Sequence, residues 1–194
     1  AGTGTQTAQM SCGGQPNGGQ VVTTEEYDGT NWSNGGDLPV AKRASAAFGT
    51  QTSAVNAAGL SPNPGTFFST SEEYDGSSWT SGGTVTTARG SHSASGILTA
   101  GLIFGGSTGP GNPGRSNATE EYDGTSFTNG GSLSTARSVI SGSPNGTQTA
   151  SYATAGIGVP GFIAETEEYN GTSWSDGGDI STPREQAMGG GTLT

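Results

Sequence analysis

The order of polar and apolar positions along the chain predicts short β-strands. Short segments rich in Thr, Tyr, Trp and Ser, which suit a pleated surface, alternate with turn residues. No segment repeats its apolar positions with the 3.6-residue period of a helix, and the density of Gly and Pro would interrupt most helices. The pattern therefore predicts an all-β protein.

One pattern occurs four times, about 47 residues apart, and defines a repeat. Glu-Glu-Tyr is followed by an Asp-Gly or Asn-Gly pair, an aromatic residue, a Gly-Gly pair and an Arg. Asp-Gly and Asn-Gly between two short strands favour a tight hairpin, because both residues tolerate positive φ. The repeated aromatic residues, which we expect to be structural, are Tyr27, Trp32, Tyr74, Trp79, Tyr122, Phe127, Tyr169 and Trp174.

The period of about 47 residues matches one four-stranded blade of a β-propeller. In the second copy the strands are expected near residues 43–48, 52–59, 67–74 and 78–85. The sequence thus predicts an all-β, four-bladed propeller in which residues 1–194 form one domain. The expected blades are residues 184–194 plus 1–42, then 43–88, 89–136 and 137–183.

The two ends of the chain suggest how such a ring closes. The segment Gly4–Ala8 matches Gly146–Ala150, which enters the second strand of its blade, whereas the piece from Arg184 to Thr194 contains only a first strand. We therefore expect the C-terminal segment to supply the first strand of blade 1. A ring closed by N- and C-terminal strands would leave no exposed sheet edge between them.

Composition changes this picture in two ways. With 37 Gly, 9 Pro, 28% hydrophobic residues and a net charge of −10, the chain would by composition alone resemble a disordered one, but its periodic aromatic residues argue for a fold. The acidic balance argues against a nucleic-acid partner, and no apolar run is long enough for membrane insertion. Cys12 is the only cysteine and is expected to be a buried thiol, with an intermolecular bridge as the alternative.

Candidate catalytic chemistry is sparse. The Glu-Glu pairs recur at the same place in every repeat, whereas catalytic carboxylates need unlike environments. A hard cation between neighbouring carboxylates stays open as an alternative. His92 is the only histidine and cannot by itself build an imidazole metal site. We expect no catalytic residue, no cofactor and no metal site, so the chain is not predicted to be an enzyme.

The repeats resemble the kelch repeat, which carries a Gly-Gly pair, a Tyr, a Trp and a following Arg. Those positions are matched by Gly13-Gly14, Tyr27, Trp32 and Arg43 in the first copy. The pair becomes Ala58-Gly59 in the second copy. The resemblance implies a kelch-like propeller, although familiar kelch propellers have more blades than four.

The amino-acid sequence of the repeats also resembles that of kelch-like repeat proteins of marine bacteriophages, as in Glu-Glu-Tyr-Asp-Gly-Thr and Gly-Thr-Gln-Thr-Ala. That resemblance implies a structural protein of the virion, such as a tail fibre, an appendage or a decoration protein that serves assembly or host attachment. The implied location is the virion or a cell surface.

A binding face is expected where the variable loops between second and third strands project beside the repeated arginines. The candidate residues are Arg43, Arg89, Arg137, Arg184, Gly109, Pro110, Asn112 and Arg115. The alternative is that each repeated Arg only holds backbone carbonyls or a neighbouring carboxylate. The predicted function is a non-enzymatic structural or binding module whose partners are other structural protein copies or a host-surface glycan or protein. A glycan- or protein-binding adhesin of a bacterial surface is the alternative, and a kelch-type enzyme is less favoured.

Overall fold

A computed structural model describes residues 1–17, 19–62, 65–109, 114–187 and 189–191. These residues form four antiparallel sheets of four strands each, and they contain no α-helix. In every sheet the strands follow one another in chain order. The all-β prediction and the division into four four-stranded units are therefore confirmed.

The first sheet contains β1 (Gly2–Thr5), β2 (Ala8–Cys12), β3 (Thr24–Tyr27) and β4 (Trp32–Asn34). The second contains β5 (Ala46–Thr50), β6 (Ser53–Leu60), β7 (Phe67–Tyr74) and β8 (Trp79–Ser81). The third contains β9 (Ser93–Ile97), β10 (Ala100–Phe104), β11 (Thr119–Tyr122) and β12 (Phe127–Asn129). The fourth contains β13 (Ser141–Gly142), β14 (Ser151–Thr154), β15 (Thr166–Tyr169) and β16 (Trp174–Asp176).

The first strand of the first sheet comes from the N-terminus, which corrects one expectation. β1 pairs with β2 from Gly2 opposite Ser11 to Thr5 opposite Ala8, so the first sheet is complete without the C-terminal segment. Residues 184–187 and 189–191 form no strand. The terminal match was misread because Gly4-Thr5 closes the first strand instead of opening the second.

Each Glu-Glu-Tyr segment lies on a third strand, and the turn that follows it joins the third strand to the fourth. In the first sheet Tyr27 pairs with Trp32 across this hairpin, and Gly29 adopts φ +94°. The Asp28 carboxylate accepts hydrogen bonds from the backbone N–H groups of Thr30 and Asn31, at 2.8 Å each. These bonds hold the pKa of Asp28 below its ordinary value. The expected hairpins are thus confirmed.

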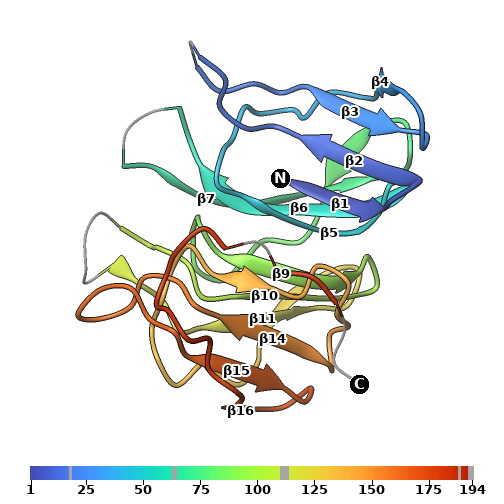
Figure 1. The fold of residues 1–194 in the computed structure, drawn as a ribbon. Helices are drawn as coiled ribbons and strands as arrows, with labels where there is room; N and C mark the ends of the chain where they lie inside the picture. The colour runs from blue at the N-terminus through green and yellow to red at the C-terminus, as the bar shows by residue number, and fades with distance from the viewer. Residues whose placement is uncertain (18, 63–64, 110–113, 188, 192–194) are drawn as a thin grey trace.

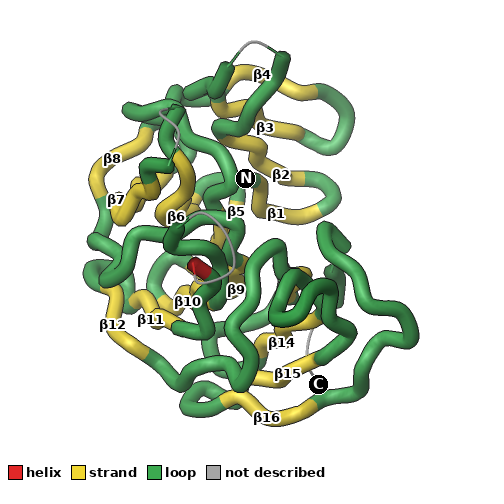
Figure 2. The backbone as a smooth tube through the Cα atoms, turned by 90° about the vertical axis from the view of Figure 1, so that its left-hand side faces the viewer, coloured by secondary structure: helices red, strands yellow, loops and turns green. Residues whose placement is uncertain are grey.

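The four sheets follow one another around a common centre, with the first at one end of the series and the fourth at the other (Figures 1 and 2). The first strands β1, β5, β9 and β13 are the inner ones, and β1 packs on β5, β5 on β9 and β9 on β13. Backbone hydrogen bonds from Ser91 to Ala44 and from Val139 to Ser91, at 2.7 and 2.8 Å, join successive sheets near that centre. The core is accordingly divided into layers between consecutive sheets.

Candidate binding surfaces

The layers between consecutive sheets share one set of contacts. At the first layer the Tyr74 hydroxyl donates to Glu26 Oε1 at 2.6 Å, and Trp79 Nε1 donates to Thr24 Oγ1 at 2.9 Å. At the third layer Tyr169 donates to Glu121 Oε1 at 2.6 Å, and Trp174 donates to Thr119 Oγ1 at 2.8 Å. The middle layer keeps the Tyr–Glu contact, between Tyr122 and Glu73, but Phe127 has no N–H to donate. In the last three sheets the repeated aromatic residues therefore contact the preceding sheet.

Burial and the neighbouring carboxylate affect these tyrosines chemically. Desolvation and the hydrogen bond to Glu26 together raise the pKa of Tyr74 to about 12. The same two causes, with Glu73 and Glu121 as the acceptors, raise the pKa values of Tyr122 and Tyr169 to about 12. Each hydroxyl is thus held protonated as a donor across the layer.

Three buried ion pairs join the segments that precede the last three sheets to glutamates of those sheets. Lys42 Nζ contacts Glu72 at 2.6 Å, Arg89 contacts Glu120 at 2.5 Å, and Arg137 contacts Glu167. The basic side chains are completely buried. Arg89 also donates through Nη1 to the carbonyls of Gly105 and Ala118, at 3.2 and 2.9 Å. This hydrogen bonding offsets part of the cost of burying the charges.

These pairs correct the expected ring of four surface arginines. Arg89 and Arg137 are buried and paired, so they cannot contact a ligand at the surface of this structure. In the first copy Lys42, rather than Arg43, occupies the equivalent position, and Arg43 is half-buried beside Leu60 through a backbone bridge. Arg43 was expected at this position because its residue type matches the other repeats. The spacing between repeats fits Lys42 better. Arg184 is exposed.

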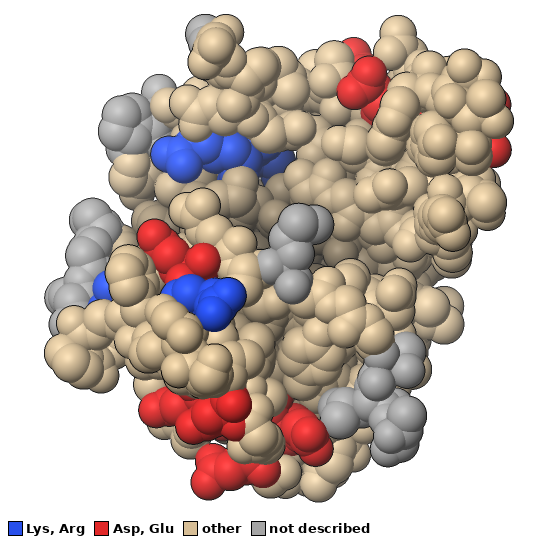
Figure 3. Space-filling model, in the orientation of Figure 1, with Lys and Arg blue, Asp and Glu red and all other residues tan. Residues whose placement is uncertain are grey.

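The loops between second and third strands are tied together in pairs. Gln20 Nε2 donates to the Ser61 carbonyl at 3.0 Å, and Arg115 Nη1 donates to the Gly158 carbonyl at 2.8 Å. Gly109 is held by a hydrogen bond from Ser107 to its carbonyl at 2.9 Å. Pro110 and Asn112 lie outside the described residues. Figure 3 shows basic side chains on the side from which these loops project, with acidic ones beside them, and further acidic side chains over β15 and β16.

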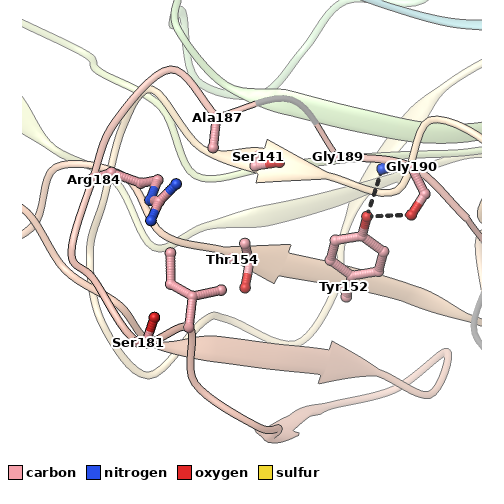
Figure 4. A pocket seen from close by; sticks show the side chains of 9 residues that line it. Ser141, Tyr152, Thr154, Ser181, Arg184, Ala187, Gly189 and Gly190 are labelled. Carbon is pink, nitrogen blue, oxygen red and sulfur yellow. Dashed lines mark hydrogen bonds between the residues drawn. The ribbon is translucent and has the colours of Figure 1, made fainter.

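The two ends of the series of sheets differ from the layers within it. On the first sheet Trp32 is 48% exposed, and Glu25 is exposed although its counterparts Glu72, Glu120 and Glu167 are buried. On the fourth sheet a cleft of about 560 Å³ is lined by Tyr152, Thr154, Ile180 and Arg184, among others (Figure 4). Part of the C-terminal segment lies against this cleft, where the Tyr152 hydroxyl contacts both the N–H and the carbonyl of Gly190.

The single histidine and the single cysteine of the chain are both buried. His92 is buried, and desolvation lowers its pKa to about 3, so it is neutral at physiological pH. Burial raises the pKa of the Cys12 thiol, which contacts Asn56 across the first layer at 3.6 Å. Among the described residues no group of three or more His, Cys, Asp and Glu side chains is arranged to hold a metal ion. No helix in the described part of the chain is long and apolar enough to cross a membrane.

No family model matches the chain, and no curated protein matches it.

Proposed function

We propose that the chain is a non-enzymatic structural and binding module whose four sheets are the blades of a kelch-like propeller. The observation that carries this proposal is the contact set repeated from layer to layer. Tyr74, Tyr122 and Tyr169 donate to glutamates of the preceding sheet, and the buried basic residues pair with glutamates of the sheet that follows them. One glutamate of each of the first three sheets, Glu26, Glu73 and Glu121, therefore joins that sheet to the next.

The proposal assigns recognition to the loops, which are the parts that differ among the repeats. A scaffold of like blades with unlike loops on one side is a common arrangement for binding surfaces. The links from Gln20 to Ser61 and from Arg115 to Gly158 support a preorganised surface of this kind. The similarity of the repeat sequences to those of phage proteins favours a virion component that serves assembly or attachment.

The experiment is a binding assay on intact particles and cells. The chain, labelled with a fluorophore, is presented to phage particles that lack it and to their bacterial hosts, and retention is measured after sedimentation. A variant in which residues 107–115 are replaced by a short Gly-Ser linker tests the loop surface, and Asp28→Asn on the opposite turns is the matched control. Retention that the linker abolishes and the control preserves supports the proposal; retention on neither particles nor cells contradicts it.

An adhesin of a bacterial surface is the second candidate, and it uses the same loop surface. The two are separated by the site of retention, because an adhesin binds cells in the absence of any particle. Hydrolysis or oxidation of a surface polysaccharide by the purified chain would contradict both candidates.

A further inference from the structure

We propose that the cleft on the fourth sheet binds the carboxylate of an acidic saccharide between the Arg184 guanidinium and the backbone N–H of Ser181. The inference rests on the proposed function and deepens it, because it names the chemical class of the ligand. Both residues line the cleft, together with Tyr152 of β14, and the C-terminal segment forms its opposite wall (Figure 4). Its volume of about 560 Å³ lies in the range of small-ligand pockets.

The same two kinds of donor hold a carboxylate in two other copies of the repeat. In the third sheet Glu120 accepts hydrogen bonds from Arg89 Nη2 at 2.5 Å and from the backbone N–H of Thr86 at 2.7 Å. The fourth sheet repeats this arrangement with Glu167, Arg137 and Ser134. In each case the backbone N–H belongs to the residue three positions before the arginine. The repeat thus builds a site for one carboxylate.

The segment around Arg184 has the same local structure. Arg184 Nε donates to the Thr182 carbonyl at 3.1 Å, just as Arg89 Nε donates to the Thr87 carbonyl at 3.2 Å. Ser181 stands three positions before Arg184, where the other copies place their backbone donor. Both donors of the carboxylate site are therefore present in this copy.

The chain itself does not fill this fourth carboxylate site. Within the part of the chain that the structure describes, Arg184 makes no ion pair and the Ser181 N–H donates no hydrogen bond. Glu25, the counterpart of Glu120 on the first sheet, is exposed. An arginine and a backbone N–H held in this arrangement are preorganised for a carboxylate, which lowers the cost of binding one.

The other groups of the cleft favour a saccharide over an acidic peptide. Ser141 presents a buried hydroxyl that has no hydrogen-bond partner among the described residues, and Tyr152 adds a second hydroxyl. Hydroxyl groups both donate and accept, as the hydroxyls of a sugar require of their partners. Of the lining residues that the structure describes, only Ile180 and Ala187 offer aliphatic side chains to the apolar groups of a peptide.

Titration followed by NMR tests the proposal. The probes are oligosaccharides of galacturonate, glucuronate and sialate, each compared with its methyl ester, which keeps the sugar and removes the charge. At least one acidic form is expected to shift the amide resonance of Ser181 and the Nε–H resonance of Arg184, and its ester is not. If no acidic saccharide shifts these resonances, or if the esters shift them equally, the proposal is wrong.

Substitutions at the two donors give a second measurement. Arg184→Ala is expected to lower the affinity by about tenfold or more, because hydrogen bonds to a charged group are lost. Ser181→Pro removes only the backbone N–H, at a position where the first copy carries Pro39 three residues before Lys42, and should lower the affinity less. Thr182→Ala is the matched control, since this exposed neighbour does not line the cleft. Equal affinities in all three variants would overturn the proposal.

Two further comparisons exclude other occupants. Glu25→Gln should leave the affinity unchanged, whereas a rise in affinity would mean that Glu25 competes for the site in solution and would overturn the proposal. Triglutamate should bind more weakly than the best acidic saccharide. Tighter binding of the peptide would assign the cleft to acidic peptides and would reject the saccharide.

The outcome is separable from that of the assay on particles and cells. A chain that binds an acidic saccharide but is retained on neither particles nor cells would contradict the proposed function alone. Retention that survives Arg184→Ala, in a chain that binds no acidic saccharide, would contradict only the present inference.

Discussion

The first and second sheets carry the same pattern in very different surroundings. Both place a Tyr at the end of the third strand and a Trp at the start of the fourth, and both stack the two rings. Tyr74 is buried against the first sheet, whereas Tyr27 is half-exposed and Trp32 is 48% exposed. The repeat therefore determines the strand and the ring pair, but the preceding sheet determines what they contribute to stability.

The largest expected difference in stability between inner and end positions concerns substitutions of the basic residues. Arg137→Ala should lower the free energy of unfolding by about 3–5 kcal/mol, because it leaves the buried carboxylate of Glu167 without its partner. Arg184→Ala should change it by less than about 0.5 kcal/mol, since the side chain is exposed. Urea unfolding at a protein concentration where the chain is monomeric measures both.

The control for this prediction replaces the whole pair. Arg137→Met combined with Glu167→Leu should recover much of the lost stability, because no unpaired charge remains buried. Equal losses for Arg137→Ala and Arg184→Ala would mean that burial does not distinguish the two positions.

The aromatic residues should show the same contrast with a smaller effect. Trp79→Ala should cost about 3 kcal/mol, because it removes buried ring surface in the first layer and the hydrogen bond to Thr24. Trp32→Ala should cost less than about 1 kcal/mol, because half of its surface is already in water. Thermal unfolding by circular dichroism gives the order, and a costlier loss at Trp32 would contradict the contrast.

Much of this architecture could be predicted from the repeat. The residues expected for the third strand of the second copy, 67–74, are those of β7, because Glu-Glu-Tyr and the Asp-Gly turn fix its end locally. The role of Lys42 was missed, since an adjacent Arg43 carried the expected residue type. The origin of β1 was also misread, because one short Gly-Thr segment fits either side of a turn. Trp32 and Trp79 differ in exposure because Trp79 packs against a preceding sheet. No local sequence pattern contains that information.

The smallest expected difference in stability concerns two glutamines in the turns between first and second strands. Gln148 Nε2 donates to the carbonyls of Gly101 and Tyr122 in the preceding sheet, at 2.9 and 3.0 Å, and Gln51 makes the equivalent bonds to Gln9 and Tyr27. Gln148→Ala should therefore cost about 1 kcal/mol, the ordinary net value for hydrogen bonds of this kind, because two carbonyls lose a donor at a partly buried site.

Gln6 occupies the same turn of the first sheet, and its side chain is exposed. Gln6→Ala should change the free energy of unfolding of the monomer by less than about 0.3 kcal/mol. Urea unfolding measures both substitutions, and a loss of stability for Gln6→Ala as large as that for Gln148→Ala would contradict the contrast.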